Sequence, residues 1–513
     1  MTPPREEPGA EDAAAVLAAE SPEPERPPGS FPVLQTILTI GVIQVVTMAF
    51  NVARSKIVAV TAGPVGIGTI SVVDQLVALV TQISTFSLPY AAVKFLSAAH
   101  SESREAFVRK YIAFLRALLA ISVTGAAIAI AIVSGWPAAL GSKLSGSVPL
   151  VILGLLTIPA MNLTGLLTNT MAAARRTRAS ALMGFWMACA TAALAGAGIL
   201  IARLAGYYVG TLAAWVLVAG GGMIYLAKKE GLHATGPRFS LLHELKTHRE
   251  ILRFAAAIYV ISFSTPLAYL VARYAVLHVA DFHAAGILQA AMGPGLALAT
   301  VMRSSNSLFL TPLMNRRIEE SEKFRGAVQF LRALSLAIAF VALPIVLFPH
   351  LLLGVLYSSR FFDAALCVFL FVVAESAQLL AGVNQTLLIG LDQIRAHVVI
   401  CLIGDSSIAG VSLLLVPRYG INGVAIAFLC HGVLVFSLTA WRLWKTRRMA
   451  IPPAMGWLPI LVLAGLALTG AVARNFPANT IPVMGAKAAV WAVFGLLLVA
   501  SGQLKTFGLF RSK

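Results

Sequence analysis

Two arginines within apolar stretches are the residues of this chain best suited to chemistry. Arg54 lies fourteen residues before Gly68, and Arg273 lies thirteen residues before Gly286. A guanidinium carries permanently charged donors in a planar fork that matches phosphate or carboxylate oxygens. A charge in lipid costs about 3 kcal/mol, so cations of this kind tend to face a water-filled cavity. The pair therefore predicts an anion-binding cavity.

Polar side chains recur on the same helical faces as these arginines. Gln44, Asn51 and Arg54 follow one another at helical spacing, and Tyr269 lies four residues before Arg273. We expect a hydrophilic chamber whose substrate-binding residues are Arg54, Lys56, Arg273, Arg303, Gln44, Asn51, Gln75, Tyr269 and Gln289. Two alternatives stay open: such polar groups also join helices by hydrogen bonds of about 0.6 kcal/mol, and Lys56 and Arg303 could extend to the membrane surfaces.

Three carboxylates fall within predicted apolar helices, namely Asp74, Glu375 and Asp405. Ionisable groups at such positions can bind and release H⁺ or Na⁺, which makes them candidate ion-coupling sites. Asp74 and Arg54 are each ten residues from Pro64, so an alternative is a structural ion pair at equal depth.

Catalytic machinery is not indicated by the sequence. It contains no nucleotide-binding loop and no nucleophile–base arrangement, and its four cysteines lie in apolar segments without metal-type spacing. We therefore expect no catalytic residue, no metal site, no cofactor beyond a coupling ion, and no enzyme activity.

The elements that must position these residues are membrane helices. The chain is 58% hydrophobic and 12% charged, whereas a soluble protein is about 25% charged. Apolar segments mostly 18 to 30 residues long alternate with short polar loops, as a hydrocarbon core about 30 Å thick requires. The sequence predicts an all-α polytopic membrane protein of about fourteen transmembrane helices.

Charge placement predicts the orientation. The net charge is +18, and most lysines and arginines fall in alternate loops, which the positive-inside rule assigns to the cytoplasm together with both termini. Contact with anionic membrane lipids accounts for this basic character, and no nucleic-acid partner is expected.

An internal repeat organises the helices. Residues 62–68, 173–178 and 206–210 match 280–286, 390–395 and 419–423 at shifts of 218, 217 and 213 residues. Such parallel repeats place substrate between two bundles. The expected divisions are a disordered cytoplasmic tail (1–30), an N-terminal six-helix bundle (31–230), a cytoplasmic linker (231–250), a C-terminal six-helix bundle (251–450), and two extra helices with a cytoplasmic tail (451–513).

Several short segments in order resemble one transporter superfamily. They are 56–60, 63–68, 266–269 with Arg273, 286–289, Pro312, 352–354 with Arg360, and 417–425. Together they resemble the polysaccharide and O-antigen flippases of the multidrug/oligosaccharidyl-lipid/polysaccharide (MOP) exporter superfamily.

This resemblance implies a MATE-like fold in the bacterial inner (cytoplasmic) membrane. It implies translocation of an undecaprenyl-diphosphate-linked oligosaccharide by alternating access for surface polysaccharide biosynthesis, with a polysaccharide polymerase and assembly proteins as partners. The two extra helices would supply a lipid-tail groove, by analogy with lipid II flippases.

Other functions remain as alternatives. The nearest are a cation-coupled multidrug exporter of the same superfamily and a lipid II-type flippase. A membrane glycosyltransferase or polymerase would need a sizeable outer loop with catalytic side chains, and the outer loops here are short. A non-transporting assembly scaffold is the remaining alternative.

Overall fold

The computed structural model describes residues 31–86, 88–174, 176–232, 249–306, 310–314, 319–447, 453–474 and 481–500, and every regular element among them is helical. The first half of the chain contains α2 (Phe31–Thr85), α3 (Leu88–Glu102), α4 (Arg104–Gly135), η1 (Pro137–Leu140), η2 (Ser145–Ser147), α5 (Val148–Leu156), α6 (Ile158–Ala173) and α7 (Thr177–Glu230). The second half contains α9 (Arg249–Val279), α10 (Phe282–Ser305), α11 (Thr311–Met314), α12 (Glu320–Leu347), α13 (Pro349–Leu356), η4 (Ser359–Ala364), α14 (Ala365–Gly390), α15 (Ile394–Tyr419), α16 (Ile421–Arg447), α17 (Pro453–Arg474) and α18 (Ile481–Ala500).

The all-α membrane fold predicted from the sequence is confirmed. Within the described ranges, ten helical spans are long and apolar enough to cross a membrane. Two of them lie in α2 and α7, and each of these helices contains a break that divides it into two crossings. With the shorter apolar helices of α17 and α18, they account for the fourteen expected helices.

A glycine forms the break in α2. Gly63 has φ 64° and ψ −168°, a conformation that essentially only glycine adopts, and Pro64 follows it. The predicted tight turn at 62–68 is thus a sharp kink between two helical segments. We call the end of the molecule that contains this kink and the α9–α10 link the turn end, and the opposite end, which contains the α3–α4 link, the basic end.

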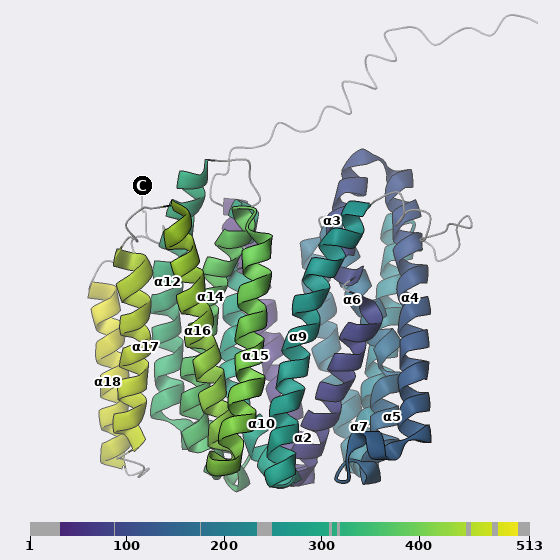
Figure 1. The fold of residues 1–513 in the computed structure, drawn as a ribbon. Coiled ribbons are helices and arrows are strands. Elements are labelled where there is room, and N and C mark those ends of the chain that lie inside the picture. Colours follow the sequence, from purple (N-terminus) through teal and green to yellow (C-terminus); the bar gives the residue numbers. More distant parts are fainter. Residues whose placement is uncertain are drawn as a thin grey trace, which may run out of the picture.

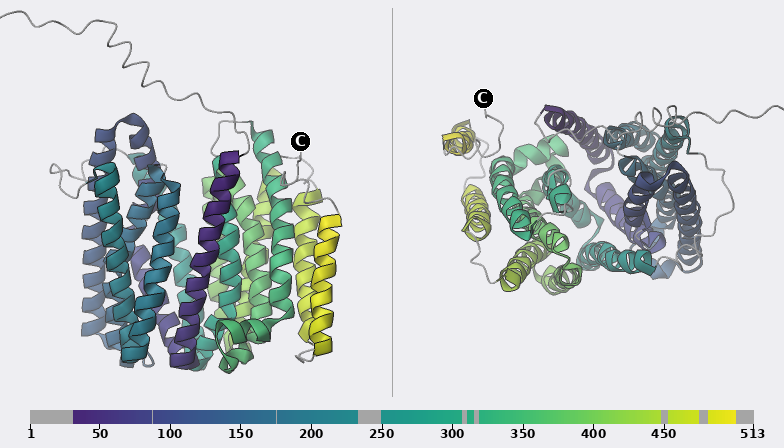
Figure 2. Two further views of the ribbon diagram at one scale, coloured as in Figure 1. Left: turned by 180° about the vertical axis from the view of Figure 1, so that it is seen from behind. Right: turned by 90° about the horizontal axis from the view of Figure 1, so that it is seen from above.

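The two halves of the chain form two groups of helices. Figure 1 shows α3 to α7 on one side and α12 to α18 on the other, with α9 between them, and the view from above in Figure 2 separates the same groups. The groups converge at the turn end and diverge toward the basic end (Figure 1). The pair α17 and α18 stands at the outer edge of the second group, beside α12 (Figure 1).

Two glycines bring the groups together at the turn end. A Cβ atom on Gly68 would lie 1.8 Å from the carbonyl oxygen of Phe282, and one on Gly286 would lie 1.9 Å from that of Pro64. Because any side chain would collide with backbone, α2 and α10 cross here in direct backbone contact. Gly68 and Gly286 are also equivalent positions of the two sequence repeats, so each repeat contributes the same glycine to its contact with the other repeat.

Lysines add further links at this end. The Lys143 ammonium donates to the carbonyls of Leu277, in the last turn of α9, and of Ala280, just after that helix. The Lys56 ammonium donates to the carbonyl of Gly354 in α13, 2.6 Å away. Carbonyls at helix C-termini carry partial negative charge, so both lysines are favourably placed.

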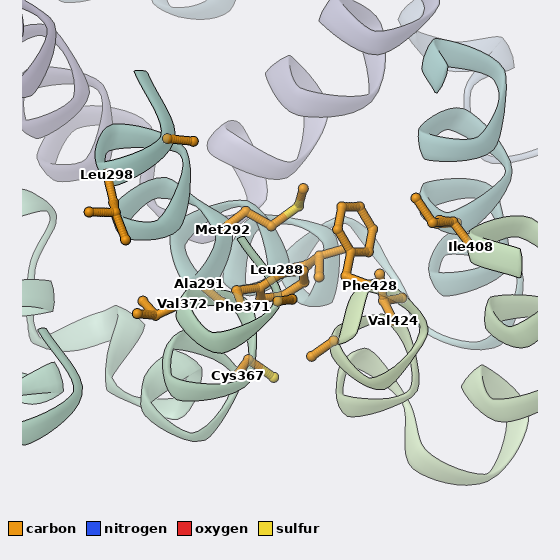
Figure 3. Close-up of a cluster of buried hydrophobic side chains, with 14 of the residues drawn as sticks. Leu288, Ala291, Met292, Leu298, Cys367, Phe371, Val372, Ile408, Val424 and Phe428 are labelled. Carbon is orange, nitrogen blue, oxygen red and sulfur yellow. The ribbon is translucent and has the colours of Figure 1, made fainter. Parts of the chain in front are cut away.

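A shared apolar core holds the second group together. Leu288 and Met292 from α10, Phe371 and Val372 from α14, and Phe428 from α16 meet in it (Figure 3). The core continues into the first group through residues such as Val73 and Tyr208.

Candidate functional site: a cationic cavity between the two repeats

A polar cavity of about 270 Å³ lies between the two groups of helices. It is lined by residues from α2, α7, α9 and α10 and by Tyr357, which follows α13. Five residues predicted from the sequence line it: Arg54, Asp74, Gln75, Arg273 and Gln289. The two repeats therefore contribute one arginine and one glutamine each.

The Arg273 side chain is buried with neutral partners. It is 6% exposed, and its guanidinium donates to the side-chain oxygens of Gln289 at 2.6 Å and Gln75 at 3.3 Å. Among the described residues it forms no ion pair. A buried charge is costly unless it is compensated, so an anion in the cavity would stabilise this cation.

Gln75 connects the two groups at this site. Its amide donates to the carbonyl of Pro266 in α9 at 3.0 Å, while its oxygen accepts from Arg273. Both ends of the amide are thereby used, which fixes its rotamer and the direction of the Arg273 guanidinium. This geometry positions the cation before any ligand arrives.

Arg54 and Asp74 line the same cavity without contacting each other. No ion pair within 4 Å joins them, and Arg54 has no hydrogen-bond partner among the residues that the structure describes. Asp74 instead accepts a hydrogen bond from the Tyr208 hydroxyl at 3.1 Å. Its side chain is exposed although it lies midway along a helix of the bundle, because it faces the cavity. The direct structural pair considered from the sequence is not formed.

Comparison with solved structures identifies the fold. No protein-family model matches the sequence, and no curated protein matches it either. The chain is similar to a multidrug resistance MATE family transporter of the MOP superfamily in an inward-facing conformation (TM-score 0.65, 12% identity, 80% of this chain and 100% of that one). It is also similar to the lipid II flippase MurJ in an inward closed conformation (TM-score 0.63, 10% identity, 91% and 99% of the two chains).

A third similar structure is a MOP superfamily transporter from Pyrococcus furiosus, for which a reverse polarity of the binding pocket suggests a different function (TM-score 0.55, 12% identity, 80% and 96% covered). This chain has the MATE-like fold of MOP superfamily transporters. At these identities the likeness establishes the fold alone.

Within the MATE-like fold, the cavity also contains aromatic residues that the sequence analysis missed. Tyr207 from α7 and Tyr357 line it, and Tyr208 reaches Asp74 from the same turn of α7. The available signal was the pair of tyrosines one helical turn after the break at Ala202–Arg203, where an aromatic hydroxyl can enter the bundle. Their direction depends on how α7 packs, which local spacing does not specify.

Four predicted substrate-binding residues with described side chains lie outside this cavity of the MATE-like fold. Lys56 bonds to Gly354 at the turn end, and Tyr269 packs on Phe428 with ring centroids 4.8 Å apart. Asn51 is exposed and Gln44 is half-buried on α2, before the kink. Arg303 lies in α10, and its side chain is outside the described part of the chain.

The remaining carboxylates are buried elsewhere in the MATE-like fold. Asp405 in α15 accepts hydrogen bonds from the hydroxyls of Ser264 and, at 2.9 Å, Thr265, the two residues before Pro266. Glu375 in α14 is 1% exposed and lies against α10, where a Cβ on Gly295 would be 3.1 Å from its Cγ. Of the three candidate coupling sites, Asp74 lines the cavity and Asp405 contacts the proline-containing part of α9.

A larger cavity of about 1000 Å³ lies within the first group of helices rather than between the groups. Its lining is mainly apolar and comes from α6 and both segments of α7, with Arg176 and Arg178 at the basic end. Its position and lining suit alkyl chains, so the smaller polar cavity is the better candidate for recognising a charged substrate.

Proposed function

We propose that this chain is a flippase that translocates an undecaprenyl-diphosphate-linked oligosaccharide across the inner membrane by alternating access. The observation that carries the proposal is the pair of arginines, one from each repeat, that face a single cavity without a carboxylate ion pair. A diphosphate would supply the missing negative charge through bidentate hydrogen bonds.

The surrounding polar groups suit the sugar part of this substrate. Gln75, Gln289, Tyr207 and Tyr357 offer donors and acceptors within the same cavity wall as the arginines. A cavity of about 270 Å³ is small beside the pockets of roughly 300–1,000 Å³ that enclose drug-sized ligands. A lipid-linked oligosaccharide would therefore require this cavity to widen during transport to hold its sugars.

The energy for transport is proposed to come from H⁺ or Na⁺. Asp74 lies close to the arginines in the cavity, so a change in its charge would alter substrate affinity directly. Asp405 bonds to Ser264 and Thr265 beside Pro266, where loss of its charge would release the helix that carries Arg273. Asp74 would couple ion binding to the substrate cavity, and Asp405 would couple it to α9 of the second repeat.

A cation-coupled multidrug exporter is the second candidate, and the exposed Asp74 carboxylate is the feature that favours it, since carboxylates attract cationic drugs. A lipid II-type flippase is the third, consistent with the likeness to MurJ. Two arginines against one carboxylate leave the described cavity wall net positive, which favours an anionic substrate over a cationic drug.

The decisive experiment deletes the gene and quantifies lipid-linked oligosaccharide on each face of the inner membrane together with surface polysaccharide. Accumulation of complete units on the inner leaflet with loss of polymer supports the proposal. Normal polysaccharide with altered drug sensitivity would instead establish the exporter, and loss of peptidoglycan precursor export would establish the lipid II-type flippase.

A further inference from the structure

A further cavity with charged side chains lies at the turn end, between the pair α17 and α18 and the rest of the second group of helices. It has a volume of about 260 Å³. Its charged and titratable side chains are His350 at the start of α13, Asp363 in η4, Arg474 at the end of α17 and Lys487 in α18. None of the functions discussed above uses these residues.

Lys487 faces this cavity rather than lipid because of its place on α18. It lies one helical turn before Trp491, so the two side chains share a face. The Trp491 indole donates to the carbonyl of Phe340 in α12 at 3.1 Å, and the two rings pack 5.3 Å apart. This contact turns the face of α18 that carries Lys487 toward the protein. Lys487 itself lies about 9 Å from the start of α18, at 1.5 Å per residue.

Tight packing makes the cavity a built feature of the fold. α17 approaches α14 so closely at Gly470 that a Cβ there would lie 2.2 Å from Cδ2 of Phe369. Gly470 and Phe369 both belong to the cavity wall. The walls are thus fixed by direct helix contacts on two sides, at Gly470 for α17 and at Trp491 for α18.

The charges in this cavity are not neutralised within the described protein. Arg474 and Lys487 are cations, Asp363 is the one carboxylate among the lining residues, and none of the three, nor His350, forms an ion pair or hydrogen bond among the described residues. A lysine held inside a membrane helix is costly without a partner. An anion of small size would satisfy both cations.

The position and size of the cavity indicate which anion it would bind. At about 30 Å³ per water molecule, 260 Å³ holds roughly nine waters, which is enough for a phosphate group but not for a sugar chain. The cavity lies between the end of α17 and the first two turns of α18, and its other walls include apolar side chains such as Val346 and Phe362. The ends of membrane-spanning helices lie near the lipid headgroups, so the phosphate of a phospholipid can reach this cavity. We propose that this cavity binds the phosphate of an anionic membrane phospholipid in the leaflet at the turn end. This proposal is independent of the transported substrate.

The test uses the full-length protein in phosphatidylcholine nanodiscs with a phosphatidylglycerol that carries a photoreactive group on its headgroup. Cross-linked peptides are mapped by mass spectrometry. Cross-links are expected on peptides that contain Arg474 and Lys487. The double variant Arg474→Gln, Lys487→Gln should reduce them about tenfold, because hydrogen bonds to charged groups are lost.

Two matched variants serve as controls. Arg418→Gln removes an exposed cation from the end of α15, also at the turn end, and should leave the cross-links unchanged. Lys487→Arg retains the charge and should preserve them. Unlabelled phosphatidylglycerol should compete, whereas excess inorganic phosphate should not. The proposal is overturned if the double variant is labelled as strongly as the native protein, if Arg418→Gln loses as much labelling, or if inorganic phosphate alone displaces the lipid.

Discussion

At the scale of single residues, the central observation is a buried cation that the described protein does not neutralise. Arg273 is held by two glutamine oxygens, which orient the guanidinium but supply only partial charge. Such an arrangement stores unfavourable electrostatic energy that an anionic ligand relieves on binding. If the cavity binds an anionic substrate as proposed, binding would be coupled to the contact between the two repeats, because Gln75 and Gln289 come from different halves of the chain.

The first prediction concerns this arginine. Arg273→Ala should reduce transport of lipid-linked oligosaccharide at least about tenfold, because a charge-assisted bidentate contact is lost. Arg273→Lys should give an intermediate value, since lysine keeps the charge but not the fork. The measurement is the amount of substrate on each leaflet at equal membrane levels of protein, with Arg418→Ala as control. Unchanged transport would remove Arg273 from the binding site.

The second prediction distinguishes a substrate-binding role of Arg54 from a structural role as the partner of Asp74. Because Arg54 and Asp74 do not contact each other, the double exchange Arg54→Asp, Asp74→Arg should fail to restore the transport that either single change abolishes. Transport by the three variants would be compared in the same deletion background. Recovery in the double variant would mean that the two side chains act as a structural pair.

At the scale of elements, the helix breaks follow the sequence repeat closely. Arg203 interrupts α7 with φ 52° and ψ −134°, and Gly420, 217 residues later, joins α15 to α16 with φ 54° and ψ −134°. The first repeat thus places an arginine in a backbone conformation that suits glycine. A side chain in such a conformation costs on the order of 1–3 kcal/mol.

The third prediction uses this difference. Arg203→Gly should stabilise the protein by roughly 1–2 kcal/mol, because it relieves the strained backbone, while added freedom of the unfolded chain offsets part of the gain. Gly420→Ala should destabilise it by a comparable amount. Thermal unfolding in detergent would measure both. A lower unfolding temperature for Arg203→Gly would show that the arginine side chain contributes more than its backbone costs.

The same comparison shows what the sequence could predict. The sequence repeat placed Arg54 and Arg273, and the turns at Gly68 and Gly286, at equivalent points, because it depends on spacing along the chain. Helical periodicity grouped Tyr269 with Arg273, but Tyr269 packs on Phe428 outside the cavity. Periodicity did not reveal that Lys56 leaves the cavity for Gly354, or that Tyr357 enters it. Those outcomes depend on the rotation and crossing of helices hundreds of residues apart, which a single sequence does not encode.

At the scale of the whole molecule, the two groups of helices meet at the turn end and diverge at the other (Figure 1). The contacts that close the turn end are the Gly68–Gly286 crossing and the lysine bonds to helix carbonyls. The cavity between the repeats is therefore expected to admit solutes from the basic end in this conformation. Opening the turn end would need these few contacts to separate.

The fourth prediction tests this access. Ser55 lines the cavity, so Ser55→Cys, in a protein whose four native cysteines are replaced, should react with a membrane-impermeant maleimide added at the basic end. Val65→Cys, exposed at the turn end, should react only from that side. Reaction of Ser55→Cys from the turn end alone would show that the resting protein is open in the opposite direction.

The crossing of Gly68 and Gly286 has a consequence for the electrical state of the membrane. A seal of backbone against backbone leaves no gap for water wires, so the protein should not conduct protons or salt while it waits for substrate. Gly68→Val would hold α2 and α10 apart, and proteoliposomes containing that variant should lose a pH gradient faster than those containing the native protein. Equal rates of loss would locate the permeability barrier elsewhere. On this argument, the two glycines contribute to electrical insulation of the membrane as well as to the packing of α2 against α10.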